Sequence, residues 1–147
     1  MLAAAILEII YCLLFKVTYW RTFVSGLVKS CGPIAAVFVV NPNPSPAGLG
    51  LMLVWLLFWE IGGQNIPADW NDVVEDQRVK GKTIPAQFGP HLAGRIVIIS
   101  LTLCVMTSLF LPLISPLPLG AYYLGASFLA GFLLLLQPAY RLIKSRE

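Results

Sequence analysis

The chain has 147 residues, of which 58% are hydrophobic and 12% are charged, and its formal net charge is +3. An average soluble domain is about 45–50% apolar and about 25% charged, so this composition indicates a chain surrounded largely by lipid. The positive charge is small and does not imply a nucleic-acid surface, so no nucleic-acid partner is expected. The three cysteines lie far apart in apolar stretches, without the spacing of metal ligands.

Five apolar stretches follow one another, at about residues 2–15, 22–40, 48–63, 92–113 and 117–138. A helix needs about 20 residues to cross a bilayer, and backbone groups in lipid must be hydrogen-bonded within the protein. These stretches are too long and too evenly apolar for barrel strands. The sequence therefore predicts an all-α fold, a polytopic transmembrane helical bundle of about five spans that forms a single domain over residues 1–147. The first stretch is short, but it lacks the features of a signal peptide and is expected to be a span.

The connections between these stretches differ in charge. The loops at 41–47 and 115–118 contain no charged residue. Eight of the ten basic residues lie in the other connections and the C-terminal tail, and Arg95 lies at the start of the fourth stretch; these nine are Lys16, Arg21, Arg78, Lys80, Lys82, Arg95, Arg141, Lys144 and Arg146. Lysine and arginine concentrate on the cytoplasmic side of membrane proteins. We therefore expect an integral, multi-pass protein with its polar segment 64–91 on the cytoplasmic side. Lys29, inside the second stretch, either reaches toward that face or lies in the bundle interior.

The polar segment is where the sequence suggests chemistry. Residues 60–85 contain five of the seven acidic residues, and Asp69, Asp72 and Asp76 follow Pro67 at spacings of three and four. If Pro67 lies in a first helical turn, these carboxylates share one helical face, where they repel unless a cation neutralises them. Oxygen ligands suit Mg²⁺, which completes its coordination with water and phosphate oxygens. The alternative is an exposed polar segment whose acids and bases pair with each other.

Two motifs in this chain resemble those of a known family. Asp72-Val-Val-Glu-Asp76, followed by Gly-Lys-Thr-Ile-Pro at 81–85, resembles the second aspartate-rich motif of the UbiA family of membrane prenyltransferases. Asp69 matches an additional aspartate found in some branches. Lys16 with Tyr11 resembles the tyrosine-and-lysine motif of that family, although Tyr11 precedes Lys16 by five residues and the family usually has four.

The resemblance implies a fold of nine membrane helices, of which this chain covers about helices four to eight. The Asn-x-x-x-Asp-x-x-x-Asp motif of the family's first half does not occur in the sequence. Because each motif of the family holds magnesium on the diphosphate, this chain is expected to supply at most half of the metal site. A complementing N-terminal half or a second copy of the chain is the expected protein partner.

The resemblance also implies the activity, which is the transfer of an isoprenyl group from an allylic isoprenyl diphosphate to an aromatic or lipid acceptor, as in quinone or lipid biosynthesis. It implies the following roles: Asp69, Asp72 and Asp76 as Mg²⁺ ligands; Lys16, Asp72 and Asp76 as catalytic residues; and Arg78, Lys80, Asn65 and Tyr11 as substrate-binding residues. The alternative role for Lys80 is contact with solvent or lipid headgroups, and the alternative role for Asn65 is to cap the helix.

Two other functions are alternatives to prenyl transfer. Membrane phosphotransferases that act on nucleotide-linked alcohols carry an Asp-Gly-x-x-Ala-Arg element, which is absent from this sequence. A catalytically inactive, truncated homologue, acting as a partner subunit or membrane scaffold, remains the alternative to an enzyme. Glu8 inside the first span is interpreted as a structural partner of Lys29, and Glu60 as either part of the polar site or a group that reaches the membrane surface.

Overall fold

The computed structural model describes residues 2–114 and 118–144. Within these residues every regular element is a helix, which confirms the all-α prediction. Three residues of the predicted turn at 115–118 and Arg146 of the predicted basic tail lie outside the described residues. Four helices are long and apolar enough to cross a membrane, and the first helix, of 13 residues, is shorter.

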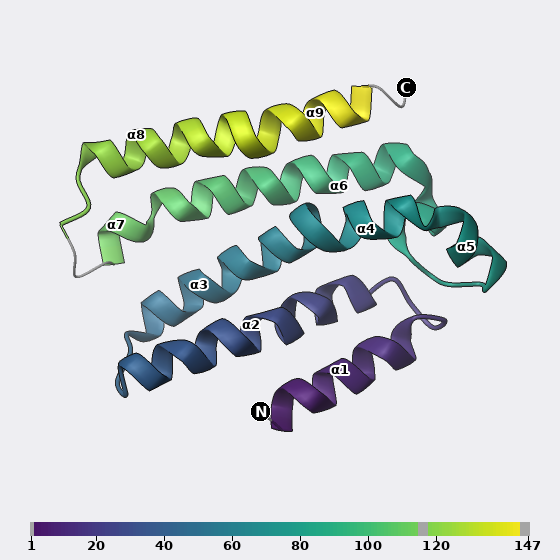
Figure 1. The fold of residues 1–147 in the computed structure, drawn as a ribbon, viewed down its shortest axis with the longest axis horizontal. Helices are drawn as coiled ribbons and strands as arrows, with labels where there is room; N and C mark the ends of the chain where they lie inside the picture. The colour runs from purple at the N-terminus through teal and green to yellow at the C-terminus, as the bar shows by residue number, and fades with distance from the viewer. Residues whose placement is uncertain (1, 115–117, 145–147) are drawn as a thin grey trace.

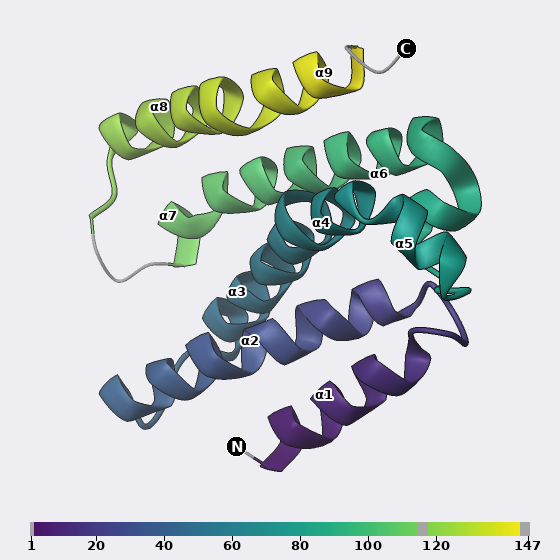
Figure 2. The same ribbon diagram turned by 45° about the vertical axis from the view of Figure 1, so that its right-hand side comes forward.

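The helices lie side by side in chain order (Figure 1), and the turned view in Figure 2 shows the same succession. In that order they are α1 (Leu2–Leu14), α2 (Arg21–Val40), a long third helix, α6 (Ile84–Leu109) with the short α7 (Leu111–Ile114), and a last helix. The last helix comprises α8 (Ala121–Ala130), a π-helical stretch η2 (Gly131–Leu136) and α9 (Gln137–Lys144). Each packs mainly against its neighbours in sequence.

The third helix is longer than its apolar stretch. It consists of α3 (Pro46–Trp59), a π-helical stretch η1 (Glu60–Asn65) and α4 (Ile66–Asn71). Ser45 caps its start by accepting a hydrogen bond from the Gly48 amide at 3.4 Å, and Pro46 occupies the first turn, where its missing N–H costs nothing. The segment predicted to be a connection from residue 64 onward therefore begins as a continuation of this helix.

After a break at Asp72, the short helix α5 (Val73–Arg78) and a loop lead to α6. Gly89 interrupts the first turns of α6 with a φ of 78°, a left-handed conformation that favours glycine, and Pro90 follows it. The chain therefore reverses direction here, visible at the right of Figure 1, before the apolar part of α6 begins.

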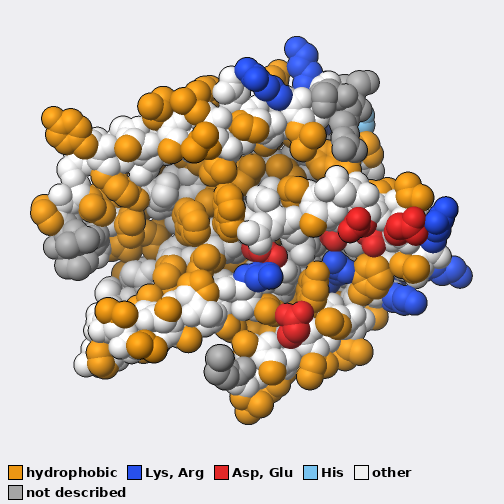
Figure 3. Space-filling view, viewed as in Figure 1, with side chains coloured by type: hydrophobic (Ala, Val, Ile, Leu, Met, Phe, Trp, Pro, Cys, Tyr) orange, Lys and Arg blue, Asp and Glu red, His pale blue; other side chains and the backbone are white. Residues whose placement is uncertain are grey.

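The buried core is small and lies near the charged end of the molecule. It joins α4, α6 and α9 through Ile66, Ile84, Ala93, Val97, Leu101 and Ala139. Many large apolar side chains on the other helix faces are exposed. Figure 3 shows apolar side chains over most of one face, with charged ones gathered toward the end that carries α5. This distribution is that of an integral membrane protein, because lipid solvates apolar surface.

Candidate functional site

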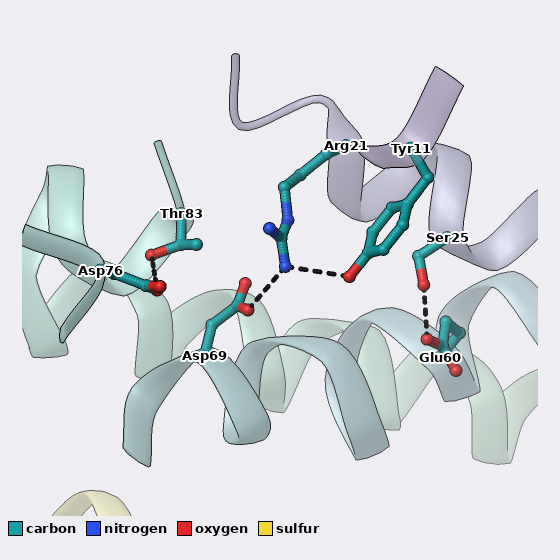
Figure 4. Close-up of polar contacts among 7 residues, drawn as sticks. All are labelled: Tyr11, Arg21, Ser25, Glu60, Asp69, Asp76 and Thr83. Atoms are coloured by element: carbon teal, nitrogen blue, oxygen red, sulfur yellow. Dashed lines mark hydrogen bonds and ion pairs between the residues drawn. The ribbon is translucent and has the colours of Figure 1, made fainter. Parts of the chain in front are cut away.

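Arg21 forms the centre of a polar cluster where three helices meet (Figure 4). Its guanidinium donates hydrogen bonds to the Tyr11 hydroxyl at 2.9 Å and to Asp69 Oδ1 at 3.0 Å. The guanidinium carbon lies 4.8 Å from the ring centre of Tyr11 and 4.7 Å from that of Phe15. Arg21 thus connects α1, α2 and α4 through an ion pair and two cation–π contacts.

This cluster is buried but its hydrogen bonding is incomplete. The side chains of Arg21 and Asp69 are only 10% and 9% exposed. Within residues 2–114 and 118–144, four buried polar atoms have no hydrogen-bond partner: Arg21 Nε, Thr22 Oγ1, Asn65 Oδ1 and Asp69 Oδ2. A buried group without a partner costs about 1–3 kcal/mol, and such groups concentrate at sites that bind ligands or water.

The three aspartates do not share one helical face, so the prediction of a single helix through them is wrong. Asp72 has φ −100° and ψ 9°, which ends α4 and separates it from α5. Asp69 is buried against Arg21, and Asp76 is buried and accepts a hydrogen bond from Thr83 at 2.8 Å. Asp72 is exposed. Among the described residues, no three acidic, histidine or cysteine side chains lie close enough together to hold a metal ion.

The loop after the aspartates is fastened to the loop between α1 and α2. Lys80 adopts a left-handed φ of 57°, and the Gly81 amide then donates to the Asp76 carbonyl at 2.7 Å. The Lys82 amide donates to the Phe15 carbonyl at 2.8 Å. A Cβ on Gly81 would lie 2.6 Å from the Phe15 ring, so any larger residue here would require the ring to move. These contacts bring the two motifs recognised in the sequence to the same end of the bundle.

The predicted basic partners of a diphosphate all lie on the surface. Arg78 pairs with Glu75 at 3.1 Å, with both side chains about two-thirds exposed. Lys16 and Lys80 are exposed, and their side chains form no hydrogen bond or ion pair with the described residues. A surface pair such as Arg78 with Glu75 contributes little to stability, so these cations remain available to an anion.

Tyr11 and Asn65 belong to a second polar feature, which Asp69, Asp72 and Asp76 do not line. Both line a polar cavity of about 250 Å³ between α1, α2 and η1. Glu60 also lines it and is buried, with its carboxylate accepting a hydrogen bond from Ser25 at 2.7 Å. Glu8 and Lys29 line the cavity too, and both are exposed; the ion pairs found among the described residues do not include them. Their predicted pairing is therefore not seen.

Two features of this site were not predicted from the sequence. Arg21 was counted only among the basic residues of a cytoplasmic loop, although it begins α2 and is buried. The sequence held one signal that Arg21 is buried. Arg21 precedes Ser25 by four residues, and this spacing places a charged and a small polar side chain on the same face of α2. Thr83 was read as part of a motif, without the hydrogen bond that it donates to Asp76.

Comparison of the sequence with known protein families gives a match. The sequence model of the UbiA prenyltransferase family matches residues 1–147. The chain belongs to the UbiA prenyltransferase family. Searches of the curated proteins and of the solved structures gave no match. The resemblance inferred from the aspartate and tyrosine motifs is thus confirmed, and UbiA membership implies membrane prenyltransferase activity in general.

Proposed function

We propose that this chain binds an isoprenyl diphosphate at its charged end and takes part in transferring the isoprenyl group to an aromatic or lipid acceptor. The observation that carries the proposal is the fastened loop: within a UbiA chain, the segment that follows Asp76 and contains Lys80 and Lys82 is hydrogen-bonded to the α1–α2 connection, which contains Lys16. Carboxylates for a metal and cations for phosphate oxygens then occur together at the end of an apolar bundle, where an isoprenoid tail is soluble.

The aspartate segment fits Mg²⁺ in its donor chemistry. Asp72 is exposed and its side chain has no hydrogen bond or ion pair with the described residues, and Asp69 Oδ2 lacks a partner. Magnesium takes one or two protein carboxylates and completes its shell with water and phosphate, so a cluster of three acids is not required. We propose Asp72 and Asp76 as ligands and Asp69 as a ligand or a group that supports them. When bound, Mg²⁺ neutralises charge on the departing diphosphate.

The chain's own residues have separate roles in this proposal. Lys16, Arg78 and Lys80 bind diphosphate oxygens and stabilise the negative charge that develops as the diphosphate leaves. Thr83 orients Asp76 through its hydrogen bond. Tyr11 and Asn65 line the polar cavity and are assigned to the acceptor side. Arg21 holds Tyr11 and Asp69 together, and so positions both sides of the site.

We also propose that the site is completed by a partner, either a chain that carries the first aspartate motif or a second copy. The absence of the Asn-x-x-x-Asp-x-x-x-Asp motif from the sequence supports this proposal. Without a partner, the chain is expected to bind Mg²⁺ weakly and to show little isoprenyl-transferase activity. A catalytically inactive subunit or scaffold remains the alternative function, and it predicts a partner but no transfer.

The proposal is tested on the chain purified in mild detergent from its own cells, through a C-terminal tag, together with whatever is bound to it. The preparation is incubated with labelled isoprenyl diphosphates and a panel of aromatic and lipid acceptors, with Mg²⁺ or with EDTA. We expect label to move into at least one acceptor only when Mg²⁺ is present. We also expect Asp72→Ala to remove this activity and Glu75→Ala, an equal loss of charge on α5, to retain it.

The absence of transfer to every acceptor, or transfer that persists in EDTA, would contradict an active magnesium-dependent enzyme. If a partner copurifies and no transfer occurs with any diphosphate, the inactive-subunit function is supported instead. Activity that is equal in Asp72→Ala and the unmodified chain would show that the chemistry lies elsewhere.

A further inference from the structure

The polar cavity between α1, α2 and η1 is distinct from the aspartate segment. Seven of its lining residues are polar or charged: Glu8, Tyr11, Ser25, Lys29, Glu60, Gln64 and Asn65. None of the described residues Asp69, Asp72 and Asp76 lines it. A polar cavity inside an apolar bundle is costly to maintain, and polar groups at such depth usually serve a ligand.

Two of the lining side chains are buried hydrogen-bond acceptors. Glu60 is 4% exposed and Asn65 is 7% exposed, and the Oδ1 atom of Asn65 has no partner in the protein. The two residues begin and end the π-helical stretch η1, a rare backbone form that occurs often at functional sites. Ser25 donates to one oxygen of the Glu60 carboxylate and fixes its position (Figure 4).

The charge of the lining determines the kind of ligand. Two carboxylates, Glu8 and Glu60, face one ammonium group, Lys29. Lys29 is exposed, whereas Glu60 and Asn65 are buried, so the deeper part of the cavity presents acceptors and negative charge. A ligand carboxylate placed there would be repelled by Glu60, whereas a hydroxyl group would donate a hydrogen bond to it.

We propose that this cavity binds the acceptor of the transfer reaction through a hydroxyl group that donates to Glu60 and Asn65. The site selects a neutral phenol or alcohol over an acceptor that carries a carboxylate. This inference rests on the proposed function, because it takes the cavity as the acceptor site of a prenyltransferase. It deepens that function by naming the chemical class of the acceptor and the side chains that recognise it.

The test uses two para-substituted phenols, hydroquinone and 4-hydroxybenzoate, of which the first carries a second hydroxyl group where the other carries a carboxylate. The chain, with any bound partner, is placed in lipid nanodiscs, and empty nanodiscs correct for partition into lipid. We expect saturable binding of labelled hydroquinone and at least tenfold weaker competition by 4-hydroxybenzoate. Glu60→Gln should weaken hydroquinone binding about tenfold, the scale of one hydrogen bond to a charged group.

Two further variants show whether a loss of hydroquinone binding is specific to substitutions in the cavity. Glu60→Gln keeps an oxygen that accepts from Ser25, and Asn65→Leu removes the unpartnered acceptor at similar volume, so both should weaken hydroquinone binding. Glu75→Gln makes the same chemical change on exposed α5 and should bind hydroquinone as the unmodified chain does. Absence of saturable hydroquinone binding, equal affinity for 4-hydroxybenzoate, or unchanged binding in Glu60→Gln would overturn the inference.

Binding of labelled geranyl diphosphate with Mg²⁺, measured on the same nanodiscs, separates this inference from the proposed function. Geranyl diphosphate binding without selective hydroquinone binding would refute the acceptor site and leave the transferase proposal standing. Hydroquinone selectivity without geranyl diphosphate binding would keep the cavity as a phenol site and refute the proposed function.

Discussion

At the scale of single residues, the contacts of Arg21 decide how the polar cluster is organised. A motif search finds Asp69 from its spacing, but it does not find its partner, which lies 48 residues earlier and on another helix. Only the packing of α1, α2 and α4 brings Arg21 between the rings of Tyr11 and Phe15. The sequence therefore identifies the acids of the site more readily than the cation that holds one of them.

Replacing Arg21 by methionine tests the importance of this contact. Arg21→Met leaves the Asp69 carboxylate buried without its partner, which should lower the free energy of unfolding by about 3–5 kcal/mol. The double variant Arg21→Met, Asp69→Leu removes both charges and should recover most of this loss, because replacing a whole buried pair by apolar groups is often neutral. Denaturant unfolding in detergent, followed by tryptophan fluorescence, measures both effects.

An Arg21→Met variant as stable as the unmodified chain would show that the pair is not formed. A double variant no more stable than the single one would show that packing of the guanidinium on the rings, and not the charge, provides the stability.

At the scale of elements, hydropathy located the helices but not all of their ends. The predicted stretch 22–40 corresponds to α2, Arg21–Val40, because charge and proline mark both of its ends. The third helix instead runs to Asn71, eight residues past the predicted end at 63. Hydropathy falls after Gly63 as polar residues begin, but helical hydrogen bonding continues through η1 and α4, which pack against α6. Asn65 and Asp69, two of the proposed site residues, lie on this polar extension.

The close approach of η1 to α6 gives a prediction about Gly62. A Cβ at this position would lie 2.8 Å from the Ser100 Cβ and 3.0 Å from the Val97 carbonyl oxygen, and the latter is backbone and cannot rotate away. Gly62→Ala should therefore reduce the free energy of unfolding by about 1–3 kcal/mol, the usual cost of overpacking. It should also weaken ligand binding, because η1 carries Glu60 and Asn65.

Gly50→Ala is the matched control for this substitution. Gly50 lies in α3, is exposed and has no atom of another element within 4 Å of the new Cβ, so alanine there should be neutral or stabilising by up to about 1 kcal/mol. Equal stability of the two variants in thermal unfolding would show that the contact between η1 and α6 is looser than described.

At the scale of the whole molecule, the arrangement of charge agrees with the alternation of spans. The α1–α2 loop, the α5 segment and α9 bring basic residues to one end, whereas the described residues of the connection between α2 and α3 carry no charge (Figure 3). Composition was enough to predict a membrane location and an all-helical fold. Every chain in lipid must satisfy its backbone hydrogen bonds internally, and basic residues concentrate on one side of the membrane. Composition did not suffice for the polar cluster, which depends on the distances between three helices.

The proposed orientation is tested by labelling single cysteines in a variant without Cys12, Cys31 and Cys104. Lys82→Cys, in the loop after the aspartates, should react with a membrane-impermeant maleimide only from the cytoplasmic side. Asn43→Cys, in the α2–α3 loop, should react only from the opposite side, because the helix between them crosses the bilayer. Labelling of both positions from one side would contradict this topology.

The central claim is that the aspartate segment binds an isoprenyl diphosphate together with magnesium. Equilibrium binding of labelled geranyl diphosphate to the chain in nanodiscs, with and without Mg²⁺, tests it most directly. We predict magnesium-dependent binding that Asp72→Ala weakens at least tenfold, whereas Glu75→Ala, with the same change of charge on α5, stays within about twofold. Binding of equal strength in the unmodified chain and Asp72→Ala, or binding that does not depend on Mg²⁺, would contradict the account.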